Sequence, residues 1–345
     1  TAPMSRRPLI AQIVATIIAG LGLAAATSAQ AWGTRGHEWI TGLAIERLPP
    51  ALPGFLRTPQ AAEDMAVISR EPDRWRASGQ AHDAERDPGH YIHVDDAGLV
   101  LGVTPFAALP PTREAFDTGL RVQGADQYQA GYLPYAINDG WQQLVRDFAL
   151  WRVERVGART AKSPADRAWF VQDLRRREAL TIRDLGVWSH YVGDAANPMH
   201  VSTHYVGWGG GPNPKGYSNA KDLHWRFEAI FVKANLDRAQ VAPLLKPYRD
   251  CACAIGARTT AYLDASRAQV IALYDLEAAD GFGKAVTPQS RAFVLARLAA
   301  GSNELRDMIM DAWMASATAE AAPGVKVADV EAGKLVVTRA QFGDE

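Results

Sequence analysis

The chain has 345 residues, of which 48% are hydrophobic and 22% charged, and its formal net charge is −1, so it can bury a substantial core in one domain or two. The near-neutral charge argues against a broad basic surface for duplex DNA, and an anionic substrate would have to be held locally, for example by metal. Cys251 and Cys253 are its only cysteines, which excludes a disulfide framework and leaves open whether these two are bonded or free.

Residues 1–31 have the three regions of a cleavable signal peptide. Arg6 and Arg7 form a basic start, residues 9–26 are almost wholly small or apolar, and Ala-Gln-Ala at 29–31 is a cleavage site. The alternative is a transmembrane anchor, but the run is near the lower length limit and is rich in Ala and Gly rather than Leu. We expect cleavage before Trp32 and an exported protein, periplasmic or secreted.

The mature part of the chain has a helical pattern, because its apolar residues recur at spacings of three and four. The pattern predicts helices at 35–48, 57–70, 134–156, 163–196, 218–234, 252–278 and 287–318, with long loops at 77–112 and 201–217. Ser163 and Pro164 form a favourable helix start, and Asn197-Pro198 ends that helix. We predict a single all-α, multi-helix domain at 32–320. A C-terminal tail at 321–345 forms a short hairpin or stays free.

Two histidines begin pairs with carboxylates at the i,i+4 spacing that places both side chains on one helix face. His190 and Asp194 form such a pair in "SHYVGDAANPMH", where His200 follows, and His224 and Glu228 form another in "DLHWRFEAIF". A solvated surface pair is the ordinary alternative for one such case. Both pairs are flanked by apolar residues, however, and buried charges are usually paired or metal-bound.

Two further segments extend this set of candidate metal ligands. Asp73 lies in "EPDRWR" and His90 in "GHYIHVDD". With His37, the set comprises five histidines and three carboxylates and no thiolate. These nitrogen and oxygen ligands suit zinc.

These motifs resemble the zinc-dependent phosphodiesterase superfamily, which joins the single-strand-specific S-one/P-one nucleases of fungi and plants with bacterial zinc-dependent phospholipases C. The stretch "WGTRGH" at 32–37 is similar to the Trp-Gly-x-x-Gly-His start of the nuclease branch. The resemblance extends from Trp32 to about residue 235. It implies an all-α fold with a trinuclear zinc cluster at the base of a cleft.

The resemblance also implies a ligand set for three Zn²⁺ ions. The first ion would take Asp73, His90, His190 and Asp194. The second would take His200, His224 and Glu228. The third would take the α-amine and carbonyl oxygen of Trp32 together with His37, and Asp194 would bridge the first and third ions. Cleavage before Trp32 would then create a metal ligand.

By the same resemblance, the protein would be an endonuclease that hydrolyses single-stranded DNA or RNA with a metal-activated hydroxide and leaves 5′-phosphates. Nothing in the sequence implies a stable protein partner, and we expect a monomer. Asp73 would orient the nucleophile or take its proton. Tyr91 would stack on a base, with core packing as its alternative role. His204 lacks a counterpart among the ligands, so we expect it in a loop or cleft wall.

Two alternatives to the nuclease stay open. His93 stands where the nuclease pattern has an Asp, and Glu228-Ala229 stands where it has Asp then Asn. These departures favour a zinc-dependent phospholipase C that acts on a phospholipid head group. A non-catalytic zinc-binding protein is the more remote alternative.

Overall fold

The computed structural model describes residues 32–76, 78–209 and 211–343, so the predicted signal peptide lies outside the described residues. The described part of the chain is built almost entirely of helices, with two small two-stranded sheets. This architecture confirms the all-α prediction. Among the described helices, none is both long and apolar enough to cross a membrane.

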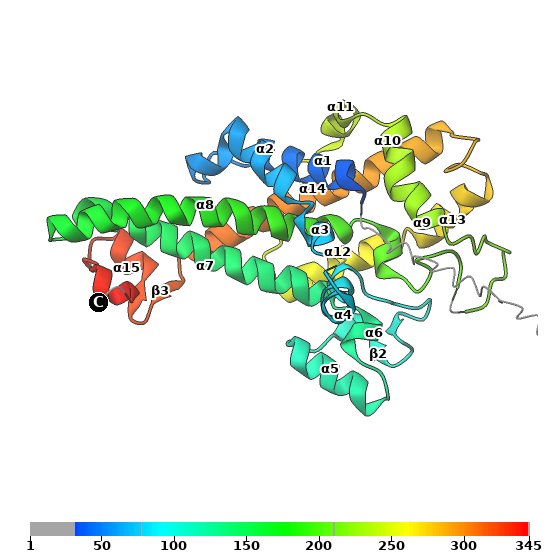
Figure 1. Cartoon of the computed structure of the whole chain (residues 1–345), viewed down its shortest axis with the longest axis horizontal. Helices are drawn as coiled ribbons and strands as arrows, with labels where there is room; N and C mark the ends of the chain where they lie inside the picture. The colour runs from blue at the N-terminus through cyan, green and yellow to red at the C-terminus, as the bar shows by residue number, and fades with distance from the viewer. Residues whose placement is uncertain (1–31, 77, 210, 344–345) are drawn as a thin grey trace, which may run out of the picture.

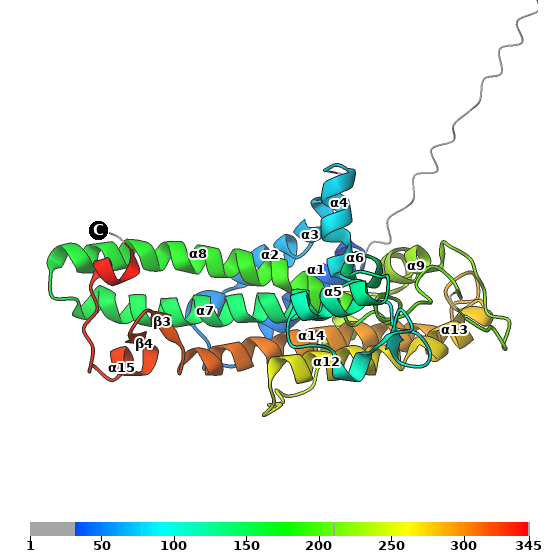
Figure 2. The same ribbon diagram turned by 90° about the horizontal axis from the view of Figure 1, so that it is seen from below.

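Two long helices form the frame of the molecule. α7 (Leu133–Thr160) and α8 (Pro164–Asp194) lie side by side as an antiparallel hairpin (Figures 1 and 2). A third long helix, α14 (Pro288–Ser316), packs against both. α1 (Thr34–Glu46) contacts α14, α8 and α2 (Pro59–Ile68). The core lies between these helices and includes the fully buried Ile40, Leu185, Val192, Leu298 and Leu305.

The chemistry at its two ends explains why α8 has these bounds. The Ser163 hydroxyl accepts a hydrogen bond from the Asp166 backbone N–H at 2.9 Å, which confirms the predicted N-cap. At the other end the helix stops at Asp194, and Asn197 caps the 3₁₀ helix η4 (Pro198–Val201). The last turn of α8 and the following 3₁₀ turn therefore present their polar side chains to the same buried region.

Two predicted helices differ from the structure in detail. The expected helix at 252–278 divides into α12 (Ile255–Arg267) and α13 (Val270–Ala278). The expected helix at 218–234 begins later, as α9 (Leu223–Trp225), and passes through a π-helix, η5 (Arg226–Phe231), into α10 (Val232–Asn235). π-Helical turns often occur at functional sites, because the extra residue re-aims the side chains that follow.

The segment predicted as a long loop at 77–112 contains short elements. They are α4 (Gln80–Arg86), the 3₁₀ helices η2 (Asp87–His90) and η3 (Phe106–Ala108), and a hairpin of β1 (Leu99–Val100) and β2 (Thr104–Pro105). The structure also adds α3 (Glu71–Arg74), α5 (Arg113–Val122), α6 (Gln127–Ala130) and α11 (Arg238–Val241). α5 was detectable in the sequence, since Thr112 caps it and its buried Phe116 and Leu120 are four residues apart.

The C-terminal segment forms a hairpin, the first of its two predicted alternatives. β3 (Glu320–Ala322) pairs with β4 (Val325–Lys326), and α15 (Val327–Glu331) and the 3₁₀ helix η7 (Arg339–Phe342) follow. These elements pack near the end of the hairpin where α7 leads into α8 (Figure 2). There Val325 and Val330 join Val153 and Phe170 in a second apolar cluster. Apolar burial therefore fixes this segment on the long helices.

Cys251 and Cys253 form a disulfide between residues two apart in the chain. The bond lies in the segment that precedes α12, and it closes a short local loop. The intervening Ala252 has a φ of 50°, a left-handed conformation that is uncommon for a residue with a Cβ.

Candidate metal centre

Eight of the nine predicted metal ligands converge in three groups, although they come from six separate segments. The groups are His37, His190 and Asp194; Asp73, His90 and His190; and His200, His224 and Glu228. Within each group the candidate ligand atoms lie within 4.8 Å of one another. Every member except Asp73 is buried.

The carboxylate of Asp194 lies between two of these groups. Its Oδ2 is 3.0 Å from Nδ1 of His90 and 3.4 Å from Nε2 of His190. Its Oδ1 lies 3.3 Å from Nε2 of His37 on the other side. Asp73 completes the first side, with its Oδ1 3.8 Å from Nε2 of His190. One carboxylate can therefore serve two adjacent cations.

The remaining group is formed by η4 and the helix that contains the π-turn. Nε2 of His224 lies 3.0 Å from Nε2 of His200 and 2.8 Å from Oε2 of Glu228. The third side, from His200 to Glu228, measures 3.8 Å. Two ligands of one tetrahedral zinc ion lie about 3.3–3.6 Å apart, given metal–ligand bonds of about 2.0–2.2 Å. The separations in the three groups, from 2.8 Å to 3.8 Å, lie on both sides of that spacing.

Backbone carbonyls fix the orientation of two of the imidazoles. Nδ1 of His190 lies 2.7 Å from the carbonyl oxygen of Ser69, and Nδ1 of His200 lies 2.6 Å from that of His90. A carbonyl only accepts hydrogen bonds, so each Nδ1 carries the proton. The Nε2 lone pairs are then directed at the ligand groups, as a metal-binding histidine requires.

Several buried polar atoms at these groups have no hydrogen-bond partner among the described residues. They include Oε1 of Glu228 and Nδ1 of His37, and also Oδ1 of Asp194 and Nε2 of His37, which lie 3.3 Å apart without hydrogen-bond geometry. Leaving such an atom buried and unpaired costs about 1–3 kcal/mol. Bound cations would satisfy the carboxylate oxygens and one nitrogen of His37, and the nitrogen and oxygen donors suit zinc, so the residues fit the predicted cofactor.

The pKa values of the site residues also favour the binding of cations. Burial raises the pKa of Asp73 to about 6 and that of Glu228 to about 8, and it raises the pKa of Asp194 well above its ordinary value. Burial also lowers the pKa of the imidazoles, to about 4 for His224. The site thus holds neutral imidazoles beside carboxylates that are desolvated by burial, and a cation would stabilise the charged form of those carboxylates.

Arg76 is a site residue that the sequence analysis missed. Its side chain is 8% exposed. Its Nη1 lies 3.4 Å from Oδ1 of Asp73, and its Nε lies 2.9 Å from Oδ1 of Asp87. It lines a cavity of about 150 Å³ together with His200 and His224. The available signal was its position three residues after Asp73, which places both side chains on one face of a helical turn. Arg76 therefore brings a guanidinium to the edge of the candidate metal centre.

The same cavity has a wall of stacked rings, which includes the predicted substrate-binding residue Tyr91. The ring of Tyr91 stacks on His93 with centroids 4.5 Å apart, and His93 stacks on Tyr205 at 4.4 Å. All three residues line the cavity. Burial lowers the pKa of His93 to about 4, so this ring is neutral near pH 7. Tyr205 carries no comparable signal in the sequence.

The motif "WGTRGH" packs the start of the described chain against the π-helix. Trp32 is fully buried, with its ring centroid 5.3 Å from that of Phe227. A Cβ on Gly36 would lie 2.8 Å from Cβ of Trp32, so this glycine allows the indole to fold back on the first turn of α1. The motif thereby brings His37 to Asp194, and whether the α-amine of Trp32 also binds metal stays a prediction.

His204 has a packing role outside the three groups. It is buried, its ring stacks on Trp208 at 3.7 Å, and its Nε2 lies 3.1 Å from Oδ1 of Asp96. The hydroxyl of Tyr274 donates to its backbone oxygen at 2.8 Å. These contacts hold the loop after η4 in place, in keeping with the loop position expected from the sequence.

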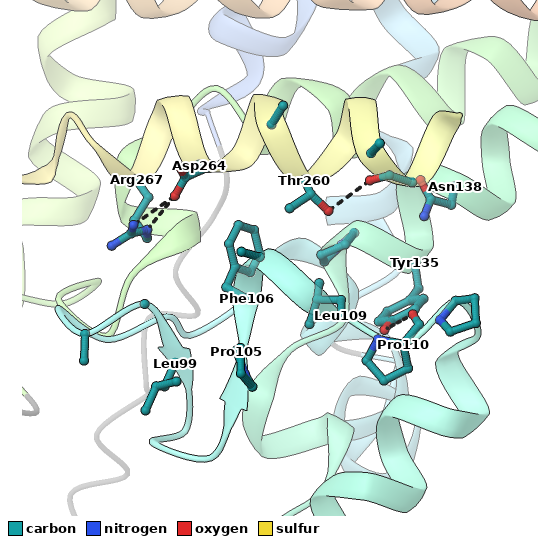
Figure 3. A pocket seen from close by; sticks show the side chains of 18 residues that line it. Leu99, Pro105, Phe106, Leu109, Pro110, Tyr135, Asn138, Thr260, Asp264 and Arg267 are labelled. Atoms are coloured by element: carbon teal, nitrogen blue, oxygen red, sulfur yellow. Dashed lines mark hydrogen bonds and ion pairs between the residues drawn. The ribbon is translucent and has the colours of Figure 1, made fainter. Parts of the chain in front are cut away.

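A larger cavity of about 790 Å³ lies between the β1–β2 hairpin and α12 (Figure 3). Its walls are mainly apolar, with Leu99, Phe106 and Leu109 on one side. Its charged lining residues, Asp264 and Arg267, pair with each other at 2.9 Å. None of the eight converging ligands lines this cavity, so the smaller cavity beside Arg76 is the candidate site.

Comparison of the sequence with protein-family models and with curated proteins found no match. The candidate metal centre therefore rests on the positions of the residues themselves. It consists of three buried groups of nitrogen and oxygen donors, joined by Asp194 and bordered by Arg76 and the stacked rings.

Proposed function

We propose that this protein is a zinc-dependent hydrolase of phosphodiester bonds, with single-stranded nucleic acid as its substrate and three zinc ions as its cofactors. The observation that carries the proposal is the position of Asp194, whose two oxygens face different groups of candidate ligands. A carboxylate shared in this way is suited to a pair of closely spaced catalytic metals. The third group, around His224, would hold the remaining ion.

The residues around the ligand groups have separate roles in this proposal. Zinc bound at these groups would supply Lewis acidity and lower the pKa of water toward neutrality. Asp73, at the edge of the centre, would accept the proton of the attacking water at its Oδ1 or orient that water. The guanidinium of Arg76 would donate to the non-bridging oxygens of the phosphate, because its planar fork matches their geometry. No covalent intermediate with the protein is needed.

The stacked rings favour a nucleic-acid substrate. Tyr91, His93 and Tyr205 form an aromatic surface on the cavity that also contains Arg76. Bases stack on such surfaces with little sequence preference. The neutral His93 has no carboxylate to accept hydrogen bonds from a base edge, so we expect weak base specificity.

A phospholipase C is the second candidate, and Glu228 followed by Ala229 favours it by resemblance. A side-by-side assay of the mature protein on single-stranded DNA and on phosphatidylcholine micelles separates the two. We expect cleavage of the DNA to products with 5′-phosphates. Hydrolysis confined to phosphatidylcholine would assign the phospholipase activity, and zinc binding without either activity would assign a non-catalytic role.

Metal analysis tests the cofactor directly. Native mass spectrometry of the mature protein should show about three zinc ions per chain, whereas one or none would contradict the proposal. Chelation should abolish hydrolysis and lower the melting temperature, because the ligands come from distant segments and metal binding is linked to folding.

A further inference from the structure

A second hollow lies beside the segment that carries the candidate ligands His224 and Glu228. A groove of about 560 Å³ lies between the start of α1 and the helix that runs from α9 to α10. Its lining includes Arg35, Arg70, Trp225, Ile230 and Lys233, and we call it the Trp225 groove. Glu228 also lines it, while His224 of the same ligand group lines the cavity beside Arg76. The segment that carries His224 and Glu228 therefore borders both the groove and that cavity, although the Glu228 carboxylate itself is buried.

The Trp225 groove carries positive charge that its own acidic residues do not balance. Arg70 pairs with Glu38 at 3.4 Å. Arg35 donates to the backbone oxygen of Lys233 at 3.4 Å. Within the described residues, no carboxylate lies within ion-pair distance of Arg35 or Lys233. This local excess of cations occurs in a chain whose net charge is −1, and it would attract a polyanion.

Large apolar side chains lie exposed beside these cations. Trp225 is 47% exposed and Ile230 49% exposed, although each neighbours a buried candidate ligand or core residue in the sequence. The indole of Trp225 is exposed in the cationic groove, so it can stack on a flat group of a bound partner. Proteins that bind single strands combine the same two features, a basic groove for the backbone and aromatic rings for the bases.

The shape of the site distinguishes a strand from a lipid surface. Interfacial binding buries the apolar face of an element that lies in the plane of the membrane. Here the cations Arg35 and Lys233 line a hollow together with Trp225, and a hollow accommodates an extended chain better than a flat bilayer.

We propose that the Trp225 groove binds the part of a single-stranded nucleic acid that extends beyond the scissile phosphate. A base stacks on Trp225, and backbone phosphates contact Arg35 and Lys233. This inference rests on the proposed function for its orientation, since the segment that carries Glu228 borders both the groove and the candidate metal centre. It implies that longer substrates are cleaved more efficiently than short ones.

Binding of a 5′-fluorescein phosphorothioate (dT)10, which resists cleavage, tests the groove by anisotropy across a series of salt concentrations. Trp225→Ala should weaken binding about 5- to 150-fold, and Trp225→Phe should retain most of the affinity. Arg35→Ala combined with Lys233→Ala should lower the slope of log affinity against log salt by about 1.4. If the double variant does not fold, Lys233→Glu replaces it. This single substitution reverses a charge in the groove, so it should also weaken binding.

Two substitutions on the α7–α8 hairpin serve as matched controls. Leu180 is 45% exposed, a fraction similar to the 49% of Ile230, and Arg159 is an exposed arginine on α7. Leu180→Ala and Arg159→Ala should leave both affinity and salt slope unchanged. Equal losses in the controls and the groove variants, or no loss with Trp225→Ala at normal zinc content, would overturn the proposal.

The ratio of kcat/KM for (dT)10 to that for bis(p-nitrophenyl) phosphate separates the groove from the proposed function. A wild-type protein that cleaves both substrates, with the same ratio in Trp225→Ala, would leave the nuclease standing and exclude the groove. If the wild type cleaves neither substrate but Trp225→Ala lowers the affinity for (dT)10, the groove would stand and the nuclease would be excluded. Loss of binding to phosphatidylcholine–phosphatidylglycerol vesicles instead of (dT)10 would replace the strand with a membrane.

Discussion

Gly33 and Ala229 are in such close contact that a side chain on the glycine would not fit. A Cβ on Gly33 would lie 2.8 Å from Cβ of Ala229 and 3.1 Å from its Cα. The contact joins the turn before α1 to the π-helix that carries Glu228. It couples the first ligand segment of the described chain to the last. The close contact therefore explains why the first glycine of "WGTRGH" has no side chain.

Gly33→Ala should therefore destabilise the protein and its zinc sites together. The neighbouring atoms belong to Ala229 and cannot rotate away, so overpacking should cost about 1–3 kcal/mol in the free energy of unfolding. Urea denaturation and zinc analysis measure the two effects. Gly54→Ala is the control, because no atom lies within 4 Å of its added Cβ. If both variants behave alike, the close approach does not matter.

A chain that begins Met-Trp32 tests whether the free α-amine of Trp32 is a ligand. An amide nitrogen lacks the lone pair that an amine donates, so this extended protein should lose the third zinc and much of its rate. The α-amine has an ordinary pKa of about 7.7–8.0, so the activity of the unextended protein should also fall on the acid side. Native mass spectrometry and an assay on single-stranded DNA compare the two chains.

Trp32→Phe is the companion variant. The chelating atoms would be backbone atoms, so this variant should keep most of its metal. Because the indole is fully buried against Phe227, the smaller ring should still lower the melting temperature. Three zinc ions and full activity in the Met-extended chain would exclude the N-terminal ligand and leave Trp32 with packing alone.

Asp194→Asn should reduce activity far more than His204→Ala. The first substitution removes the charge between two ligand groups, and we expect a loss of at least about 100-fold in kcat together with loss of zinc. The second removes an imidazole stacked on Trp208, so it should chiefly lower the melting temperature. Steady-state kinetics on protein confirmed as folded by circular dichroism compares them. Similar kinetic losses would place His204 in the centre.

Arg76→Ala should lower kcat by about 10²–10³-fold while leaving the zinc content unchanged, because one donor to the phosphate is lost. Arg76→Lys keeps the charge but not the fork, and it should recover part of the rate. Arg74→Ala is the control, since its side chain is 56% exposed and pairs with Glu71. An unaltered kcat in Arg76→Ala would exclude its contact with the substrate.

Glu154→Gln should stabilise the protein at neutral and alkaline pH. Glu154 is buried in the α7–α8 hairpin, and desolvation raises its pKa from 4.5 to about 7 against the opposing charge of Arg177. The native state thus holds a proton that the unfolded state releases above pH 4.5, so stability falls as pH rises from about 4.5 to 7.

Above pH 7 the neutral amide should gain up to about 3 kcal/mol over the wild type, and the difference should vanish below pH 4.5. Urea denaturation at several pH values, with zinc at saturation, measures it. Glu63→Gln on the exposed face of α2 should stay within about 0.5 kcal/mol of the wild type. A pH-independent difference for Glu154→Gln would show that its carboxyl does not titrate in this window.

The local features of this protein followed from its sequence. Helical periodicity located the long helices, and Ser163 and Asn197-Pro198 marked the ends of α8 within about two residues. The i,i+4 spacings selected His190 with Asp194 and His224 with Glu228 as pairs on common faces, and both pairs do converge in the structure. Each of these features depends on contacts within a few turns of one helix, which is why the pattern alone was sufficient.

Tertiary packing decided how those pairs meet. That the two oxygens of Asp194 face His37 on one side and His90 on the other depends on α1 and η2 both reaching the end of α8. The periodicity of one helix carries no information about such long-range contacts. The same holds for the aromatic wall completed by Tyr205 and for the C-terminal hairpin on α7 and α8, where residues distant in sequence become neighbours because burying their apolar surfaces together lowers the free energy of the fold.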